Sequence, residues 1–373
     1  MKKLYLLLAF ILFFLGGFVT GTLFSTKNNM LNSITIGQNP QSSKELEQKT
    51  PPMPEPSTTK MLIGYIQDFR DPSVANYHQL THVIFSFAHP TKDGNVLLNG
   101  DTALDHLRTM VSKAHQNSTK AILAIGGWFH INGGESYAYF KAAIASPAAR
   151  TKLVNELMKL TETENLDGID IDFEHPRSQE DAVNLHAFIQ ELSAKLHPQG
   201  KELSVAVHSK IHSVTGTELG FIMYEPTMFQ YVDHVNIMAY DGQWDGGYHA
   251  ANLSPYPFTE KIVNYWTTLF DTHNLSKEKL VLGVPFYAQP EDPKSKQVSY
   301  DALIKNNPDN AGKDSVNLNG TTYYYNGEET IQRKTKLALD NGFGGIMMWE
   351  VGLDAKGEHS LTAAISAEMK KIK

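Results

Sequence analysis

The chain has 373 residues, a hydrophobic fraction of 41% and a formal net charge of -7, which is typical of a globular protein with a sizeable core. The negative charge and the lack of a concentrated basic stripe argue against nucleic acid or an anionic membrane surface as the main partner. Because there is no cysteine, disulfides, thiol nucleophiles, zinc–thiolate sites and a lipidated cysteine are excluded. We therefore expect a neutral or cationic small molecule, or a sugar polymer, as the partner.

The N-terminus carries an export signal. Lys2 and Lys3 precede an apolar run of 21 residues, LYLLLAFILFFLGGFVTGTLF, at positions 4–24. Val19, Thr20 and Gly21 offer a cleavage site for a signal peptide, but the run is also long enough to span a bilayer. Residues 1–24 are predicted to be either a cleaved signal peptide or an N-terminal membrane anchor, and both place the rest of the chain outside the cytoplasm, secreted or tethered.

Residues 25–59 are poor in large apolar side chains and rich in Ser, Thr, Pro and Gln. This composition predicts a disordered, solvated linker. One folded domain, which we expect to be monomeric, then extends over residues 60–373.

Short apolar runs alternate with amphipathic stretches after residue 60, which is typical of strands and crossover helices in a parallel sheet. Strands are predicted at residues 61–66, 82–88, 120–126, 168–174, 203–209, 232–240, 280–287 and 343–350. Helices are predicted at residues 103–115, 147–163, 178–197, 258–271, 328–340 and 360–371.

Eight strand–helix units predict an α/β fold, a (β/α)8 TIM barrel, whose functional residues lie at the C-terminal ends of the strands. A doubly wound open sheet is the alternative. No phosphate-binding GxGxxG or GxxxxGK[ST] motif follows the first strand, which argues against a nucleotide-binding protein. We expect no cofactor.

The segment DGIDIDFEHP, residues 167–176, places several acids in a strand that otherwise looks buried. Side chains alternate between the two faces of a strand, so Asp170, Asp172 and Glu174 share one face. In a barrel the apolar residues between them face the covering helices, and the acids point inward. Glu174, at the C-terminal end, reaches the mouth of the barrel first.

Three interpretations of these acids were weighed. Solvated charges on an edge strand do not explain the strongly apolar opposite face. A calcium loop requires DxDxDG with a later glutamate, whereas the glycine here is second, so we expect no metal at this strand. Acid catalysis remains, because crowding and burial raise the pKa of one carboxyl group until it can donate a proton near neutral pH.

The segment DGIDIDFE resembles DxxDxDxE, the signature of glycoside hydrolase family 18, the chitinases and related enzymes. The likeness extends over most of residues 60–373. It includes IGYI with Gly64 and Tyr65, THVIFSFA, AIGGW with Gly126, Gly127 and Trp128, NIMAYD with Met238, Tyr240 and Asp241, GVPFY, and GGIMMWE with Trp349.

The resemblance implies a retaining hydrolysis in which the 2-acetamido oxygen of the substrate replaces an enzymic nucleophile and an oxazolinium ion forms. Glu174 would protonate the glycosidic oxygen and later take a proton from water. Asp172 would orient the acetamido N–H, with Asp170 supporting Asp172. Tyr240 would donate to the acetamido oxygen, and Trp349 would form the floor of the site.

Further residues are expected to contact the sugar. Aromatic rings stack on the apolar faces of sugars, although any one ring is more often part of a core. The candidate platforms and polar contacts are Tyr65, Trp128, Trp244, Tyr287, Trp349, Asp241 and Met238. Gly127 is expected to let the backbone pack beside the site. The fifteen histidines form no HExxH pattern, and His208 and His212 are interpreted as surface or core residues.

The chain also departs from the family pattern. Ala124 stands where the family often has a serine that helps to position the inner aspartates. Phe173 and His175 replace the usual aromatic residues beside Glu174, and we expect both to lie off the reacting face. Only about 55 residues separate GVPFY from FGGIMMWE, so a large inserted α+β domain is predicted to be absent. A shallow cleft suited to endo cleavage or to short oligomers would follow.

Chitin or an N-acetylglucosamine oligomer is the expected substrate. An endo-β-N-acetylglucosaminidase acting on N-glycans or on cell-wall glycan is the alternative within the same mechanism. A chitin-binding lectin with the same barrel is an alternative of another class, and retention of Glu174 favours the enzyme. The hypothesis of a membrane-tethered structural protein would explain the linker, but it assigns no role to the acidic residues within positions 167–176.

Overall fold

The structure is a computed structural model that describes residues 60–371. The predicted signal or anchor segment and the linker, residues 1–59, lie outside the described residues. Within residues 60–371, no helix combines the length and the apolar character needed to cross a membrane.

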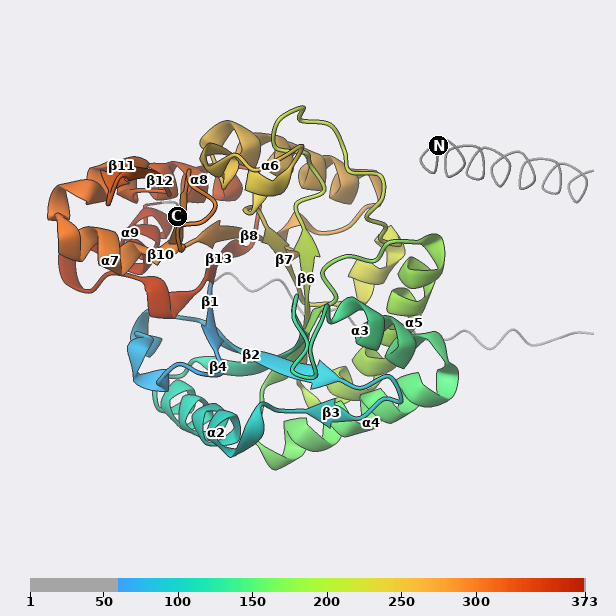
Figure 1. Cartoon of the computed structure of the whole chain (residues 1–373). Helices are drawn as coiled ribbons and strands as arrows, with labels where there is room; N and C mark the ends of the chain where they lie inside the picture. Colours follow the sequence, from blue (N-terminus) through green and yellow to red (C-terminus); the bar gives the residue numbers. More distant parts are fainter. Residues whose placement is uncertain (1–59, 372–373) are drawn as a thin grey trace, which may run out of the picture. The chain divides into compact units, whose positions relative to one another are not determined.

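Eight parallel strands form a closed barrel in the order β1-β13-β8-β7-β6-β5-β4-β2, and pairing of β1 with β2 closes it (Figure 1). The strands are β1 (Met61–Gln67), β2 (His82–Pro90), β4 (Lys120–Gly126), β5 (Gly168–Asp172), β6 (Glu202–His208), β7 (His234–Met238), β8 (Leu280–Pro285) and β13 (Gly345–Trp349). The predicted TIM barrel is confirmed, with every strand at its predicted position. A short strand β3 (Val96–Leu97) extends β2 at its end.

All of the predicted helices are present: α2 (Gly100–Gln116), α4 (Pro147–Thr163), α5 (Gln179–Leu196), α6 (Tyr256–Thr272), α8 (Glu328–Asp340) and α9 (Leu361–Met369). The start of α5 is capped as its sequence suggested, since the Ser178 hydroxyl accepts a hydrogen bond from the Asp181 N–H at 3.1 Å. A further helix, α3 (Tyr137–Ala145), precedes α4 and was not predicted.

Two of the expected strand–helix units lack their α-helix. The β1–β2 connection contains the 3-10 turns η1 (Pro72–Val74) and η2 (Tyr77–Gln79), and the β6–β7 connection contains η4 (Pro226–Tyr231). Pro72 interrupts the first segment, and Gly216, Gly220 and Pro226 interrupt the second, which disfavours several continuous helical turns in either. The other 3-10 turns are η3 (His197–Gln199), η5 (Gly242–Trp244), η6 (Ala250–Asn252), η7 (Lys277–Lys279), η8 (Pro308–Gly312), η9 (Val351–Leu353) and η10 (Gly357–His359).

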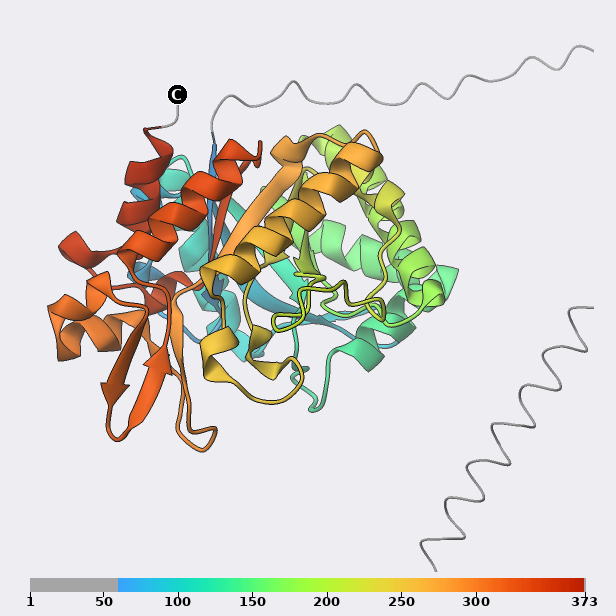
Figure 2. The same ribbon diagram turned by 90° about the horizontal axis from the view of Figure 1, so that it is seen from above.

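A small α+β insertion lies between β8 and α8. Its antiparallel sheet has the order β10-β9-β12-β11 and is accompanied by a short helix. The elements are β9 (Tyr287–Pro290), β10 (Val298–Ser299), α7 (Tyr300–Asn306), β11 (Ser315–Leu318) and β12 (Thr321–Tyr324). Figure 2 shows its β11–β12 hairpin at the end of the barrel opposite to the start of β1 and the end of α9. The insertion is small, and the predicted absence of a large inserted domain is confirmed.

Apolar side chains form two separate clusters. The larger one fills the layer between the barrel and its helices and includes Ile169 and Ile171 of β5. The smaller one lies inside the barrel and includes Ile63, Ile84 and Met347. The alternation expected for β5 is confirmed, because Ile169 and Ile171 pack against the helices.

A buried lysine fastens α8 to the chain before α6. The side chain of Lys334 is completely buried, and its ammonium donates to the Ser254 carbonyl at 2.5 Å, to the Ser254 hydroxyl at 2.7 Å and to the Asn326 amide oxygen at 2.7 Å. These three acceptors match the three protons of the group.

Replacement of Lys334 by methionine is therefore expected to lower the free energy of unfolding by about 3 kcal/mol, because buried acceptors lose their donor. Lys336→Met, on the exposed side of the same helix, is the matched control and should change stability by less than about 0.5 kcal/mol. Urea unfolding of both variants measures the difference. Equal effects would show that the three hydrogen bonds contribute nothing to stability.

Candidate active site

The acidic face of β5 points into the barrel. Asp170 is fully buried, Asp172 is 3% exposed, and the Glu174 side chain, just beyond the strand, is 19% exposed. This gradient follows from the alternation of the strand and from its direction toward the mouth. The carboxyl group that reaches solvent is therefore the one that the sequence predicted.

Asp170 is held by donors from three other strands. The Tyr65 hydroxyl donates to Asp170 Oδ2 at 2.7 Å, and the Ser204 hydroxyl donates to Oδ1 at 2.5 Å. The Asn236 amide donates to the same Oδ1 at 3.2 Å. Burial raises the pKa of Asp170, and the hydrogen bonds from Ser204, Tyr65 and Asn236 partly offset that rise.

Ser204 supplies the hydroxyl group that Ala124 lacks. Asp170 pairs with Ala124 of β4 on one side and with Ser204 of β6 on the other. The inner aspartate thus receives a hydroxyl from the opposite neighbouring strand. Asp170 therefore keeps a hydroxyl donor although residue 124 is an alanine.

Asp172 has an unused acceptor. Its Oδ1 is buried and makes no hydrogen bond to any of residues 60–371. Burial raises the pKa of Asp172 well above its ordinary value, and the charges of Glu174 and Asp170 raise it further. A buried acceptor without a donor is costly, so the group is suited to a donor that arrives with a ligand.

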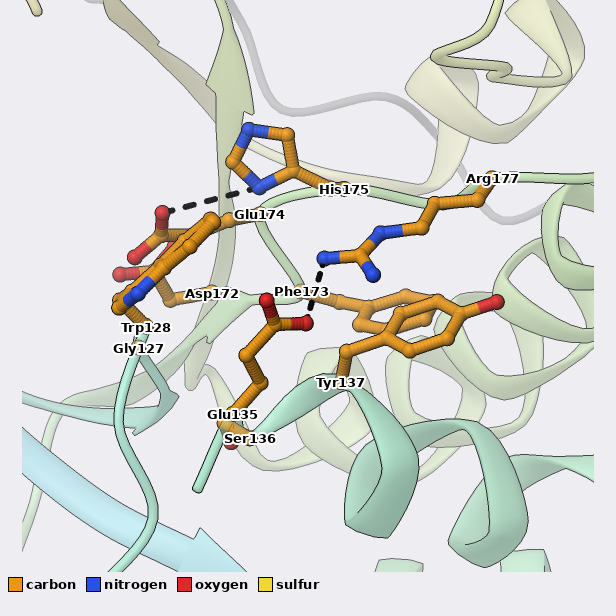
Figure 3. A pocket seen from close by; sticks show the side chains of 10 residues that line it. All are labelled: Gly127, Trp128, Glu135, Ser136, Tyr137, Asp172, Phe173, Glu174, His175 and Arg177. Atoms are coloured by element: carbon orange, nitrogen blue, oxygen red, sulfur yellow. Dashed lines mark hydrogen bonds and ion pairs between the residues drawn. The ribbon is translucent and has the colours of Figure 1, made fainter. Parts of the chain in front are cut away.

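Glu174 has the electrostatics of a proton donor. Burial, followed by the charge of Asp241, raises its pKa to about 8. The carboxyl group is therefore largely protonated at neutral pH while the mouth of the barrel leaves it accessible. Figure 3 shows Glu174 and Asp172 extending to the same side of the pocket.

His175 lies closer to the acid than we predicted. Its Nδ1 is 3.8 Å from Glu174 Oε2 (Figure 3), so the expectation that it lies off the reacting face is wrong. Burial lowers the pKa of His175 to about 4, and the neighbouring Arg177 contributes to the shift. His208 lies next to His175, with 5.1 Å between the ring centroids. Phe173, in contrast, is buried against Tyr137 and Phe140, as expected.

The residues after β7 form a second polar group at the mouth. Tyr240 is 6% exposed, and its hydroxyl contacts only the Met347 sulfur, at 3.9 Å, among the described residues. Asp241 accepts hydrogen bonds from the Tyr287 hydroxyl at 2.5 Å and from the Gln243 amide at 3.1 Å. Tyr240 therefore has a hydroxyl free for a ligand, whereas Asp241 is held by its neighbours.

Trp349 ends β13 above the interior cluster. Its ring is stacked with Phe87 at 5.8 Å and tilted against Tyr65 at 5.5 Å. The next residue, Glu350, is completely buried and accepts a hydrogen bond from Arg70 Nε at 2.6 Å. The ring is thus supported from below, and the chain beyond it is fixed by an ion pair.

Two glycines let β4 approach β5 closely. A Cβ atom on Gly126 would lie 2.1 Å from the Asp172 carbonyl oxygen, and one on Gly127 would lie 2.7 Å from the Phe87 ring. The Gly127 N–H donates to the Asp172 carbonyl at 3.0 Å. The supporting role predicted for these glycines matches this close approach.

A pocket extends from Glu174 toward the start of α3. Trp128, 41% exposed, stands at one side with its ring 5.1 Å from that of His175. At the other side Arg177 lies over the Tyr137 ring at 4.2 Å and pairs with Glu135 at 2.7 Å (Figure 3). The pocket is lined by Gly127, Trp128, Glu135, Ser136, Tyr137, Asp172, Phe173, Glu174, His175 and Arg177.

Most of the predicted site residues come together at the mouth, and Met238 packs below them against the interior cluster. Trp244, which follows Asp241 after β7, is 63% exposed and packs against Tyr248. Ser204, Asn236 and Phe87 also support the site, and no local pattern in the sequence predicted them. Their positions were predictable only from the pairing of strands that are distant in sequence.

The comparisons with known proteins agree with this geometry. The family model described as "Glycosyl hydrolases family 18" matches residues 61–354. The chain belongs to this family. The match begins at β1 and includes all eight barrel strands.

Curated relatives share moderate identity with the chain. "Probable chitinase 10" of Drosophila melanogaster is 30% identical over 58% of this chain, but the match covers 10% of that protein. "Chitinase B" of Serratia marcescens is 26% identical over 58% of this chain and 51% of its own length. "Endochitinase 1" of Metarhizium anisopliae is 24% identical over 78% and 79%. The chain thus spans about half of the second relative and much less of the first.

Solved structures show the same fold. The family 18 chitinase ChiB of Flavobacterium johnsoniae has a TM-score of 0.70 and 26% identity, and the match covers 85% of this chain and 96% of that one. A chitinase of Bacteroides thetaiotaomicron has a TM-score of 0.69 and 26% identity, with coverage of 84% and 97%.

The role of Ser204 on β6 can be tested by moving its hydroxyl group to residue 124 on β4. Ser204→Ala is expected to lower the free energy of unfolding at pH 7 by about 1–3 kcal/mol, because a buried carboxylate loses a donor. The double variant Ala124→Ser/Ser204→Ala should recover part of that loss, since residue 124 pairs with Asp170 from the other side. Urea unfolding measures both changes.

Ser193→Ala is the matched control, since this buried hydroxyl contacts His197 and no carboxylate. It should lower the free energy of unfolding by less than Ser204→Ala. A Ser204→Ala variant no less stable than the control would contradict the role that we give to Ser204.

Proposed function

We propose that this protein is a chitinase-like hydrolase that cleaves β-1,4-linked N-acetylglucosamine oligomers or polymers by substrate-assisted catalysis. One observation carries the proposal. A proton-donating carboxyl group, Glu174, stands at the mouth of a barrel directly beyond a buried aspartate whose acceptor is unused. Family membership and the chitinase names of the relatives add support.

Glu174 acts as the general acid. Its pKa of about 8 keeps a proton available for the glycosidic oxygen near neutral pH. When the leaving sugar departs, the resulting carboxylate takes a proton from the incoming water. No enzymic nucleophile is required, because the 2-acetamido oxygen attacks the anomeric carbon of the same sugar.

Asp172 and Tyr240 orient the acetamido group. The unused Oδ1 of Asp172 accepts its N–H, and the free Tyr240 hydroxyl donates to its oxygen. In its ionised form, Asp172 also offsets the positive charge that develops on the oxazolinium ion. Asp170, whose own acceptors are occupied, raises the pKa of Asp172 through its charge.

Aromatic rings bind the sugars. Trp349, supported by Phe87 and Tyr65, forms the floor under the reacting ring. Trp128 stands over the pocket next to Glu174 and binds the leaving side of the chain. The complex of a tobacco class V chitinase variant with NAG4, at 17% identity, has the same fold.

The cellular setting completes the proposal. The hydrolase works outside the cytoplasm as a monomer, either secreted or anchored through residues 4–24, with residues 25–59 as the linker. Polymeric or oligomeric sugar reaches it there without crossing a membrane.

Product analysis tests the function. The purified full chain is incubated in parallel with chitin oligomers, N-glycans and cell-wall glycan, and products are identified by mass spectrometry. We expect cleavage of chitin oligomers, with loss of at least about 10³-fold in kcat for Glu174→Gln while oligomer binding is kept.

Glu135→Gln, also beside the pocket, is the matched control and should keep its turnover. An N-acetylglucosamine thiazoline, which mimics the oxazolinium ion, should inhibit the wild type. Binding without turnover in the wild type would identify a lectin. Cleavage of N-glycans alone would identify an endo-β-N-acetylglucosaminidase in place of a chitinase-like enzyme.

The pH dependence tests the acid. Because Glu174 must be protonated, kcat/KM is expected to fall as the pH rises through about 8. Asp241→Asn removes a charge that raises the pKa of Glu174, so the alkaline limb should move to lower pH. A steady-state pH profile of both proteins measures the shift, and identical limbs would contradict the role of Asp241.

A further inference from the structure

A second cluster of ionisable side chains lies at the other end of the barrel. His82, Glu202 and His234 are the first residues of β2, β6 and β7, so they lie at the N-terminal ends of the strands. Glu174 lies beyond the C-terminal end of β5. The cluster is therefore separate from the candidate active site.

The three side chains converge on one point. His82 Nε2 is 3.0 Å from Glu202 Oε2, and His234 Nε2 is 3.4 Å from the same oxygen. One ligand atom from each residue lies within 4.8 Å of the others. Ligands about 2.0–2.1 Å from a tetrahedral ion are about 3.3 Å apart, so two of these separations already match such a site.

We propose that His82, Glu202 and His234 bind a divalent transition-metal ion, with Zn²⁺ as the best match. Two imidazoles and one carboxylate are ligands that Zn²⁺ accepts in tetrahedral sites. Water completes the coordination. The side chains are 7%, 19% and 14% exposed, so an ion enters from solvent at this end of the barrel.

The polar contacts of His234 add to the proposal. Both ring nitrogens are buried, and apart from the 3.4 Å approach of Nε2 to Glu202 neither has a polar partner within residues 60–371. Neutral imidazole carries one N–H and one lone pair, and buried groups of this kind nearly always find a partner. A metal ion at the convergence point gives the lone pair of Nε2 its partner.

The surroundings provide the outer contacts of a metal site. Thr81 Oγ1 is 2.8 Å from His82 Nδ1, the nitrogen that faces away from Glu202. Lys120 pairs with Glu202 Oε1, the oxygen that the histidines do not approach. Partners on the far side of the ligands fix their orientation in metal sites.

The ion would act as a clamp within the fold. β6 and β7 are neighbours in the barrel, whereas β2 is paired with β1 and β4. Coordination therefore joins β2 to β6 and β7, with which it shares no backbone hydrogen bonds. The role is structural, and it stands whether or not the proposed hydrolase activity is correct.

Metal binding to the full chain, purified without a histidine tag and stripped with EDTA, tests the proposal. We expect one Zn²⁺ per chain by calorimetric titration and a rise in Tm of a few degrees at saturating Zn²⁺. Co²⁺ should give the visible absorption bands of a four-coordinate ion. An ion-pair network without metal predicts none of these changes, and their absence overturns the proposal.

Variants locate the site. His234→Gln and Glu202→Gln should each abolish the Zn²⁺-dependent rise in Tm and the Co²⁺ bands. His115→Gln is the matched control, because His115 forms a comparable pair with Asp167, at 2.8 Å, outside the cluster. It should keep both signals. Loss of the signals in the control, or their retention in both cluster variants, would place the ion elsewhere and overturn the assignment.

Discussion

The burial of three carboxyl groups on one strand is the constraint on which the site depends. A buried carboxylate loses its hydration, and each neighbouring carboxylate adds repulsion. The barrel meets this cost unevenly. Asp170 receives hydrogen bonds from Tyr65, Ser204 and Asn236, whereas Asp172 keeps one acceptor without a partner. The hydrogen-bond donors surround Asp170 inside the barrel, whereas the acceptor without a partner belongs to Asp172, which lies nearer to the mouth.

The uneven distribution of hydrogen-bond donors also gives the neighbouring acids different electrostatic surroundings. Asp170 is stabilised as an anion by its donors, and its charge contributes to the raised pKa of Asp172. The pKa of Glu174 is raised mainly by burial and then by the charge of Asp241, which lies beyond the end of β7. The pKa of each of these neighbouring carboxyl groups is thus raised by burial together with a different set of surrounding groups. The short motif has this effect only because the barrel brings other strands around it.

The sequence was sufficient for features that depend on local periodicity. Each barrel strand, the long helices and the inward direction of Asp170, Asp172 and Glu174 follow from alternation and helical spacing. Features that depend on strand register were not predictable in this way. Ser204 lies 34 residues after Asp170 and meets it only through the pairing of β5 with β6. His175 was placed wrongly, because the backbone leaves the regular strand after Asp172 and alternation no longer applies.

The insertion after β8 is connected to the chemistry through one hydroxyl group. Tyr287 is the first residue of β9, and its hydroxyl donates to Asp241, favouring the charged form of that acid. Asp241 in turn raises the pKa of Glu174. The small insertion thus influences Glu174 in two steps. Evolution, or a protein engineer, could retune the working pH by altering this peripheral sheet while leaving the acidic strand untouched.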